Sequence, residues 1–140
     1  MIAELRERLH SGGHTLVVGS ASGEVRCFEG RGVSDLYRLY TSDSRFLKSA
    51  EIADKVVGRA AAALMILGGV KRIHTDVISS LALSLFQGAG VEVDFDEEVP
   101  HIINRKRDGW CPLETRCKDC TTPEECFIQI ESFMKETLSK

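Results

Sequence analysis

Four of the five cysteines lie within sixteen residues near the C-terminus, at a spacing that could hold a metal ion. They are Cys111, Cys117, Cys120 and Cys126, and Cys27 stands apart in a stretch typical of a buried strand. Thiolates bind zinc and iron–sulfur clusters, and the two-residue gap between Cys117 and Cys120 is that of a zinc knuckle. These four cysteines therefore predict either a zinc or iron–sulfur site or a redox-sensing pair.

Cys111 also has a second interpretation, as a nucleophile. The segment Cys111-Pro112-Leu113-Glu114 has the pattern of a helix start, with cysteine at the cap and proline at the first helical position. A thiol there faces the positive end of the helix, and the basic run 105–107 nearby favours the thiolate. We expect Cys111 to attack a substrate, Glu114 and Asn104 to orient it, and Asn104 and Arg105 to bind the ligand. A thiolate held by a structural metal could not react in this way.

The elements that position these residues follow from the hydrophobic pattern. In chain order it predicts a helix over 2–10, a hairpin of strands 15–18 and 24–28, a short helix near 33–40, a mostly apolar helix over 51–67, a strand over 72–78, a helix over 81–87, a strand over 91–95, and helices beginning at 111 and 122. A strand, short helix and strand in succession should form a right-handed parallel crossover. The predicted fold class is α/β, a three-layer α-β-α sandwich with a mixed sheet in which a hairpin is followed by α-β-α-β. We expect a single domain over 1–140 with a cysteine-rich helical segment over 111–140.

A group of ionisable side chains marks the first turns of the predicted helix over 51–67. In α/β sheets, ligands gather at the carboxyl ends of parallel strands, beside the N-termini of the following helices, which favour anions. This rule places Asp54 and Lys55 near Ser79 and Ser80. We expect Lys55 and Arg59 to meet anionic groups, Asp54 to accept hydrogen bonds or act as a base, and both serines to contact the ligand. The alternative is a solvated polar stripe where the helix leaves the core.

Composition and charge exclude several classes of protein. The formal net charge is −3, whereas proteins that coat nucleic acid carry a clustered positive field. The most apolar run, 60–67, is too short to cross a bilayer, and the first residues lack the apolar stretch of a secretion signal. We therefore expect a cytoplasmic protein with a small-molecule ligand and without nucleic-acid or membrane partners. A homo-oligomer is compatible with this composition.

Several segments resemble one known family. They are Asp54-Lys55-Val56-Val57-Gly58, Leu67-Gly68-Gly69-Val70, Asp76-Val77-Ile78-Ser79, Ile103-Asn104-Arg105 and Cys111-Pro112-Leu113-Glu114. Over about residues 14 to 130 the chain resembles the bacterial and archaeal domain-of-unknown-function family numbered 1893. The resemblance implies a divergent branch of the cytidine-deaminase-like fold. Deaminases bind zinc through His-x-Glu or Cys-x-Glu at one helix start and Pro-Cys-x-x-Cys at another. The corresponding stretches, 53–55 and 79–82, contain no histidine or cysteine, so the resemblance implies no zinc-dependent deamination.

Taken together, these observations predict a cytosolic pocket protein of deaminase-like fold that binds a nucleotide-like or other anionic small molecule. It would need no cofactor and would carry a reactive cysteine, while enzymatic activity stays open. The alternative is a non-catalytic metal-binding or redox-sensing module that uses the C-terminal cysteines. A third reading is a protein-interaction domain with a vestigial pocket.

Overall fold

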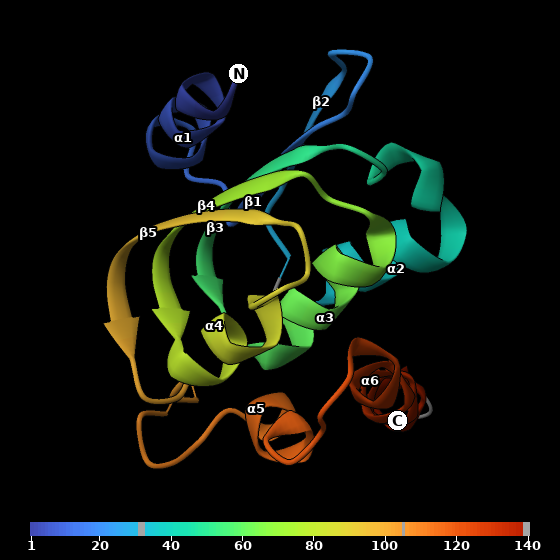
Figure 1. Ribbon diagram of the computed structural model, residues 1–140. Coiled ribbons are helices and arrows are strands. Elements are labelled where there is room, and N and C mark those ends of the chain that lie inside the picture. The colour runs from blue at the N-terminus through green and yellow to red at the C-terminus, as the bar shows by residue number, and fades with distance from the viewer. Residues whose placement is uncertain (31–32, 105, 139–140) are drawn as a thin grey trace.

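Helices and strands alternate along most of the chain in the computed structural model, which describes residues 1–30, 33–104 and 106–138 (Figure 1). The strands are β1 (Leu16–Gly19), β2 (Val25–Phe28), β3 (Glu51–Val57), β4 (Arg72–Ser79) and β5 (Glu92–Val99). The helices are α1 (Ile2–Ser11), α2 (Ser34–Ser42), the short 3-10 helix η1 (Ser44–Phe46), α3 (Arg59–Gly68), α4 (Ser80–Phe86), α5 (Pro112–Cys117) and α6 (Pro123–Leu138). None of these helices in the described part of the chain is long and apolar enough to span a membrane.

The strands form one mixed sheet in the order β2-β1-β3-β4-β5. β1 is antiparallel to both β2 and β3, whereas β3, β4 and β5 run parallel. The register pairs Leu16 with Asp54, Asp54 with Thr75, and Thr75 with Phe95. The mixed α/β sandwich is confirmed, as are the hairpin and the parallel pairing of the strands predicted over 72–78 and 91–95.

The prediction of one helix over 51–67 is wrong in its first half. Residues Glu51–Val57 form β3, the central strand of the sheet, and the helix begins only at Arg59. β3 pairs with β1 over its first four residues and with β4 along most of its length, and this pairing overrides its local helical pattern. The predicted glycine end of the helix is confirmed, because Gly69 caps α3 in the left-handed conformation at φ 80°.

Gly58 makes the sharp transition from β3 to α3 as the N-cap of the helix. A Cβ atom on this residue would lie 3.1 Å from both Glu114 Oε1 and Ile102 Cγ1. A larger residue here would press against both side chains, so Glu114 and Ile102 cover the start of α3 closely.

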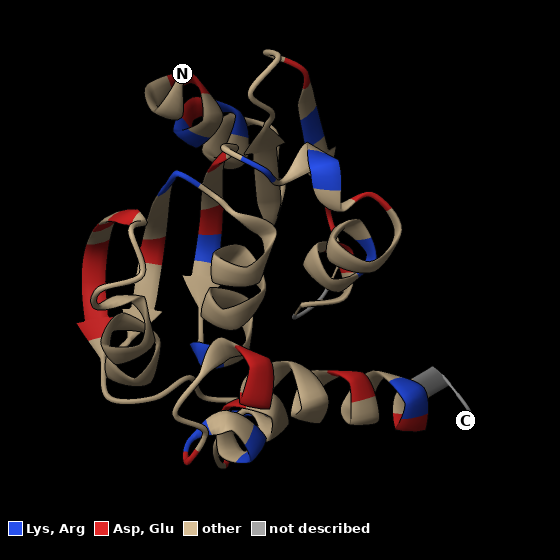
Figure 2. Ribbon diagram, turned by 45° about the vertical axis from the view of Figure 1, so that its right-hand side comes forward, with Lys and Arg blue, Asp and Glu red and all other residues tan. Residues whose placement is uncertain are grey.

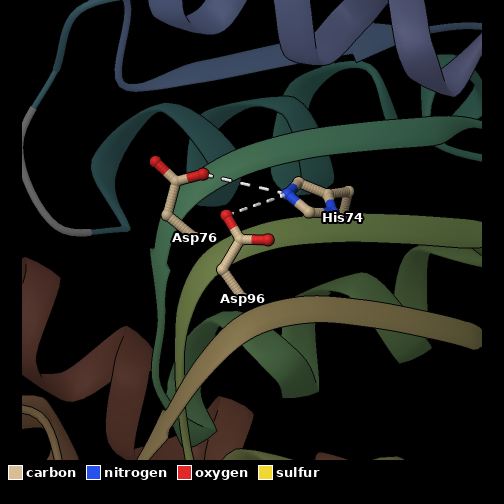
Figure 3. A group of neighbouring side chains, drawn as sticks. All are labelled: His74, Asp76 and Asp96. Atoms are coloured by element: carbon tan, nitrogen blue, oxygen red, sulfur yellow. Dashed lines mark ion pairs between the residues drawn. The ribbon is translucent and has the colours of Figure 1, made fainter.

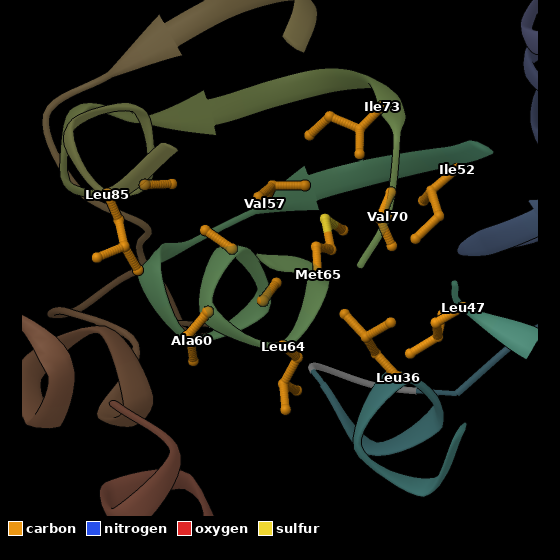
Figure 4. Close-up of a cluster of buried hydrophobic side chains, with 14 of the residues drawn as sticks. Leu36, Leu47, Ile52, Val57, Ala60, Leu64, Met65, Val70, Ile73 and Leu85 are labelled. Atoms are coloured by element: carbon orange, nitrogen blue, oxygen red, sulfur yellow. The ribbon is translucent and has the colours of Figure 1, made fainter. Parts of the chain in front are cut away.

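The two faces of the sheet are covered unequally (Figure 1). Leu5 and Leu9 of α1 pack against Val17 and Ala53 on one face. The opposite face carries α2, α3 and α4, with α5 and α6 packed against α3. The helix α3 is apolar around most of its circumference, and it can therefore be buried between the sheet and the other helices (Figure 4).

Acidic side chains concentrate on one edge of the sheet. Five of the eight residues of β5 are aspartate or glutamate, and Figure 2 shows this strand as the most strongly acidic element. β5 pairs only with β4 in the described sheet, so its outer edge is free.

Candidate functional site

The starts of α3 and α4 lie at the carboxyl ends of β3 and β4, where the sequence predicts the ligand site. Glu114, on α5, is 2% exposed and faces the first turn of α3. Its Oε1 accepts a hydrogen bond from the Arg59 backbone N–H at 2.8 Å, and its Oε2 accepts one from the Ile102 N–H at 2.9 Å. The carboxylate therefore caps α3 from a distant part of the chain and satisfies an otherwise unpaired helix donor.

The side chain of Arg59 runs from α3 to two neighbouring segments. Its guanidinium donates to the Leu81 carbonyl oxygen, to Ser84 Oγ at 2.8 Å and to the Cys120 carbonyl oxygen. The residue is only 8% exposed. Arg59 thus joins α3 to α4 and to the loop before α6, and its hydrogen bonds are made within the protein.

The remaining polar residues predicted near this site also have partners in the chain. Ser79 caps α4, with its Oγ accepting from the Ala82 N–H at 3.0 Å, and Ser80 Oγ donates to Glu98 at 2.6 Å. Asn104 bonds with Asp108 inside its own loop. Arg105 lies outside the described residues.

Cys111 is the N-cap of α5, as the sequence predicts, and is half-buried against the main core. Its thiol makes no capping hydrogen bond to the helix. Pro112 is the first residue of α5, which confirms the helix start predicted at this place.

Asp54 and Lys55 do not lie at a helix start, which corrects their predicted placement. Both are inside β3, and Asp54 is level with Thr75, four residues before Ser79 on β4. Four residues of extended strand span roughly 13 Å, so Asp54 is well removed from the serines. Burial raises the pKa of Asp54 to about 7, and the nearby charge of Asp76 adds to this shift. Hydrogen bonds from the backbone of Val56 and Lys55 oppose it.

We predict that Asp54→Asn makes stability less dependent on pH. The native pKa of about 7 lies above the ordinary value of 3.8, so the folded state keeps a proton that the unfolded chain releases. Below the unfolded-state pKa of 3.8, Asp54 contributes its full stability to the fold. This contribution is lost as the pH rises through the folded-state pKa of about 7. Urea unfolding at about pH 5 and about pH 8 should show the advantage of the variant growing with pH. Asp119→Asn, at an exposed position, is the control, and an equal response in both variants would contradict the prediction.

Three of the four C-terminal cysteines, Cys117, Cys120 and Cys126, interact with one another, and Cys120 and Cys126 also interact with Arg59. A hydrogen bond from the Cys117 thiol, with help from Cys120 and Arg59, lowers the pKa of Cys126 to about 7 although burial opposes it. The pKa of Cys117 is raised, first by its hydrogen bond with Cys126, and burial raises that of Cys120 to about 11. The arrangement favours one thiolate at Cys126 next to the Arg59 cation. No three of the four cysteine sulfurs all lie within 4.8 Å of one another, so these residues do not form a preassembled metal site.

A hollow of about 590 Å³ lies elsewhere, between α2, η1, the end of α3 and the start of α6. Its walls combine aromatic, hydroxyl, basic and glycine residues: Tyr40, Thr41, Ser44, Arg45, Lys48, Leu67, Gly68, Gly69 and Phe127. Tyr40 and Phe127 meet edge to face, with ring centroids 5.3 Å apart. Arg45 and Lys48 are exposed and have no ion-pair partner among the described residues. Sequence reasoning missed this site because its walls come from three separate segments and share no local motif.

The fold and the site together define a mixed α/β sandwich domain. In it, the N-terminal N–H groups of α3 and α4 donate buried hydrogen bonds to side chains of the protein itself. A family model matches residues 4–134, and the chain belongs to the domain-of-unknown-function family DUF1893. The solved structure of a DUF1893 family protein from Thermotoga maritima is similar over 90% of this chain and 84% of that chain, with 25% sequence identity and a TM-score of 0.81. No curated protein matches the chain. The family resemblance expected from the sequence is therefore confirmed.

Proposed function

We propose that this protein binds a small anionic molecule carrying a flat ring, such as a nucleotide, in the hollow between α2, α3 and α6. The observation that carries the proposal is that Arg45 and Lys48, which have no ion-pair partner in the described part of the chain, lie beside the aromatic pair Tyr40 and Phe127. A volume of about 590 Å³ lies in the range of small-ligand pockets. Cations there would hold the anionic group, and an aromatic face would support the ring.

The backbone at the end of α3 contributes to this proposal. Gly68 and Gly69 line the hollow beside Leu67, so part of this wall is main chain that a ligand can approach. The hydroxyl of Thr41 donates to the Tyr37 carbonyl oxygen, which leaves its oxygen free to accept from a ligand. The wall thus offers hydrogen-bonding groups as well as charge.

We further propose that the fold is a divergent cytidine-deaminase-like fold that has lost the deaminase chemistry. The support is the chain order, in which a hairpin is followed by helix-strand units with parallel strands β3, β4 and β5. Deaminases place zinc ligands at the starts of the two helices that follow such strands. Here those starts are residues 58–61 and 79–82, which offer no histidine or cysteine. The carboxylate of Glu114 and the guanidinium of Arg59 are hydrogen-bonded within the protein at this place. The residues present do not fit a zinc ion, so no metal-activated water is available there.

We predict that adenosine monophosphate binds the wild-type protein in isothermal titration calorimetry more tightly than either inorganic phosphate or adenosine. The double variant Arg45→Ala/Lys48→Ala should weaken this binding by about tenfold or more, since each charge-assisted hydrogen bond contributes about 1.5–3 kcal/mol before solvent screening. The matched control is Lys118→Ala/Lys135→Ala, which removes two exposed lysines outside the hollow. Equal binding by both double variants would rule out this hollow as the ligand site.

A further inference from the structure

A second group of polar side chains lies on the other face of the sheet, the one that α1 covers. His74 and Asp76 are two positions apart on β4, and Asp94 and Asp96 are two positions apart on β5. Because residues two positions apart share a face of a strand, all four side chains project from the same face of the sheet. The register pairs His74 directly with Asp94. His74 Nε2 lies 3.8 Å from Asp76 Oδ1 and 3.8 Å from Asp96 Oδ2, and Figure 3 shows both carboxylates directed at this one nitrogen.

The Nε2 atom of His74 is buried and has no hydrogen-bond partner among residues 1–30, 33–104 and 106–138. The residue is 1% exposed, and a separation of 3.8 Å is too long for a hydrogen bond to either carboxylate. Buried polar atoms are nearly always paired, because leaving one unpaired is costly. A ligand between the nitrogen and the two carboxylates would remove that cost.

Asp94 fixes the chemical form of the imidazole. Its Oδ2 lies 2.7 Å from His74 Nδ1, and an ionised carboxylate can only accept, so Nδ1 carries the proton. In the neutral imidazole, Nε2 then presents its lone pair to Asp76 and Asp96. A carboxylate behind a histidine that presents its other nitrogen is the usual outer support of a metal-binding histidine.

We propose that His74 Nε2, Asp76 and Asp96 bind a divalent first-row transition-metal ion. The ligand atoms of these three residues all lie within 4.8 Å of one another, and they are the one such group of histidine, cysteine, aspartate or glutamate in the described part of the chain. Ions of this class sit about 2.0–2.2 Å from nitrogen and carboxylate ligands, which fits between atoms 3.8 Å apart. The imidazole favours such an ion over calcium or magnesium, which prefer oxygen ligands alone.

The surroundings of the group suit a cation that enters from solvent. The side chains of Asp76 and Asp96 are 27% and 55% exposed, so water can complete the coordination. Two cationic or titratable groups of α1 face the carboxylates: His10 Nε2 lies 2.9 Å from both oxygens of Asp76, and Arg6 lies 3.8 Å from Asp96. With the ion bound, His10 could remain on Asp76 and hold it in position. The site is on the opposite face from the helix starts and independent of the proposed ligand hollow.

The test uses the full chain, freed of metal with a chelator and titrated with Co²⁺ in calorimetry and visible spectroscopy. We expect one ion per chain and weak visible bands, without the intense near-ultraviolet band of cobalt–thiolate bonds. Asp96→Asn and Asp76→Asn should each weaken binding by about tenfold or more, and Asp94→Asn by about tenfold through the lost support of His74. The matched control is Glu97→Gln, which removes the same charge from the same strand and should change binding less than about twofold.

Several outcomes would overturn the proposal. They are no stoichiometric binding by the wild-type chain, a cobalt–thiolate band that shows the cysteines as ligands, or equal loss in Glu97→Gln and Asp96→Asn, which would indicate general attraction to an acidic strand. Calcium binding as strong as that of Co²⁺ would also contradict it, because His74 would then play no part. The aspartates are exposed enough that these variants should fold, which circular dichroism checks.

Discussion

Glu114→Ala is expected to lower the free energy of unfolding by about 4 kcal/mol, because it leaves one buried and one part-buried N–H group without an acceptor and each costs about 1–3 kcal/mol. These groups are the backbone N–H of Arg59 and Ile102, at 2.8 and 2.9 Å from the carboxylate oxygens. Domains of this size are stable by only about 5–15 kcal/mol, so the loss would be a large fraction of the total. Urea unfolding followed by circular dichroism measures it.

Glu114→Gln separates the hydrogen bonds from packing. The amide keeps one acceptor oxygen but presents an NH₂ group to the second N–H donor, so its effect should lie between those of wild type and Glu114→Ala. Glu124→Gln, at an exposed position of α6, should change stability by less than about 0.5 kcal/mol. If both Glu114 variants were as stable as this control, the carboxylate would not be the cap of α3 and its predicted catalytic role would regain support.

Arg59→Met is the second substitution with a large expected effect, a loss of about 3 kcal/mol, since hydrogen bonds to a charged group contribute about 1.5–3 kcal/mol each. The guanidinium joins α3 to Leu81, Ser84 and Cys120. Arg59→Lys should recover little of this loss, because a single ammonium cannot match the planar fork that reaches two segments at once. Arg38→Met, at an exposed position of α2, is the control in the same urea experiment.

A second measurement distinguishes the role of Arg59 from simple packing. Its charge and hydrogen bond help to lower the pKa of Cys126, so Arg59→Met should raise the pH at which the Cys126 thiolate forms. The thiolate absorbance in the far ultraviolet follows this titration, and Cys126→Ser identifies the signal. An unchanged titration in folded Arg59→Met would contradict the contact between the two side chains.

Local signals predicted much of the fold. The cap at Ser79, the proline at position 112 and the glycine pair 68–69 mark helix ends that the structure confirms. β3 was missed because its sequence, Glu51–Val57, carries charges at helical spacing and runs directly into the helix-forming alanines of α3. Only its two neighbouring strands make it a strand, and pairing between distant segments is not visible in a local pattern.

The candidate sites could be predicted only in part for the same reason, because their contacts join residues far apart in the sequence. The sequence predicted that Arg59 meets an anionic ligand and that Glu114 orients Cys111, but the partners of these two side chains lie up to 61 residues away and could not be identified from spacing. His74 was assigned correctly to a strand, yet its association with Asp96 depends on the register of β4 and β5. Residues at alternate positions, such as His74 and Asp76, were the one local signal that could have indicated a shared face.

The acidic character of β5 has a consequence for how copies of this chain can meet. An exposed strand edge is a template for pairing with another chain, and charged side chains are one means of preventing it. Two copies of β5 placed edge to edge would bring like charges together along the whole strand, which opposes sheet extension on that side. The other edge, β2, contains a single charged residue, Arg26, and is only four residues long. The sheet is thus protected from aggregation at one edge by charge and at the other by shortness.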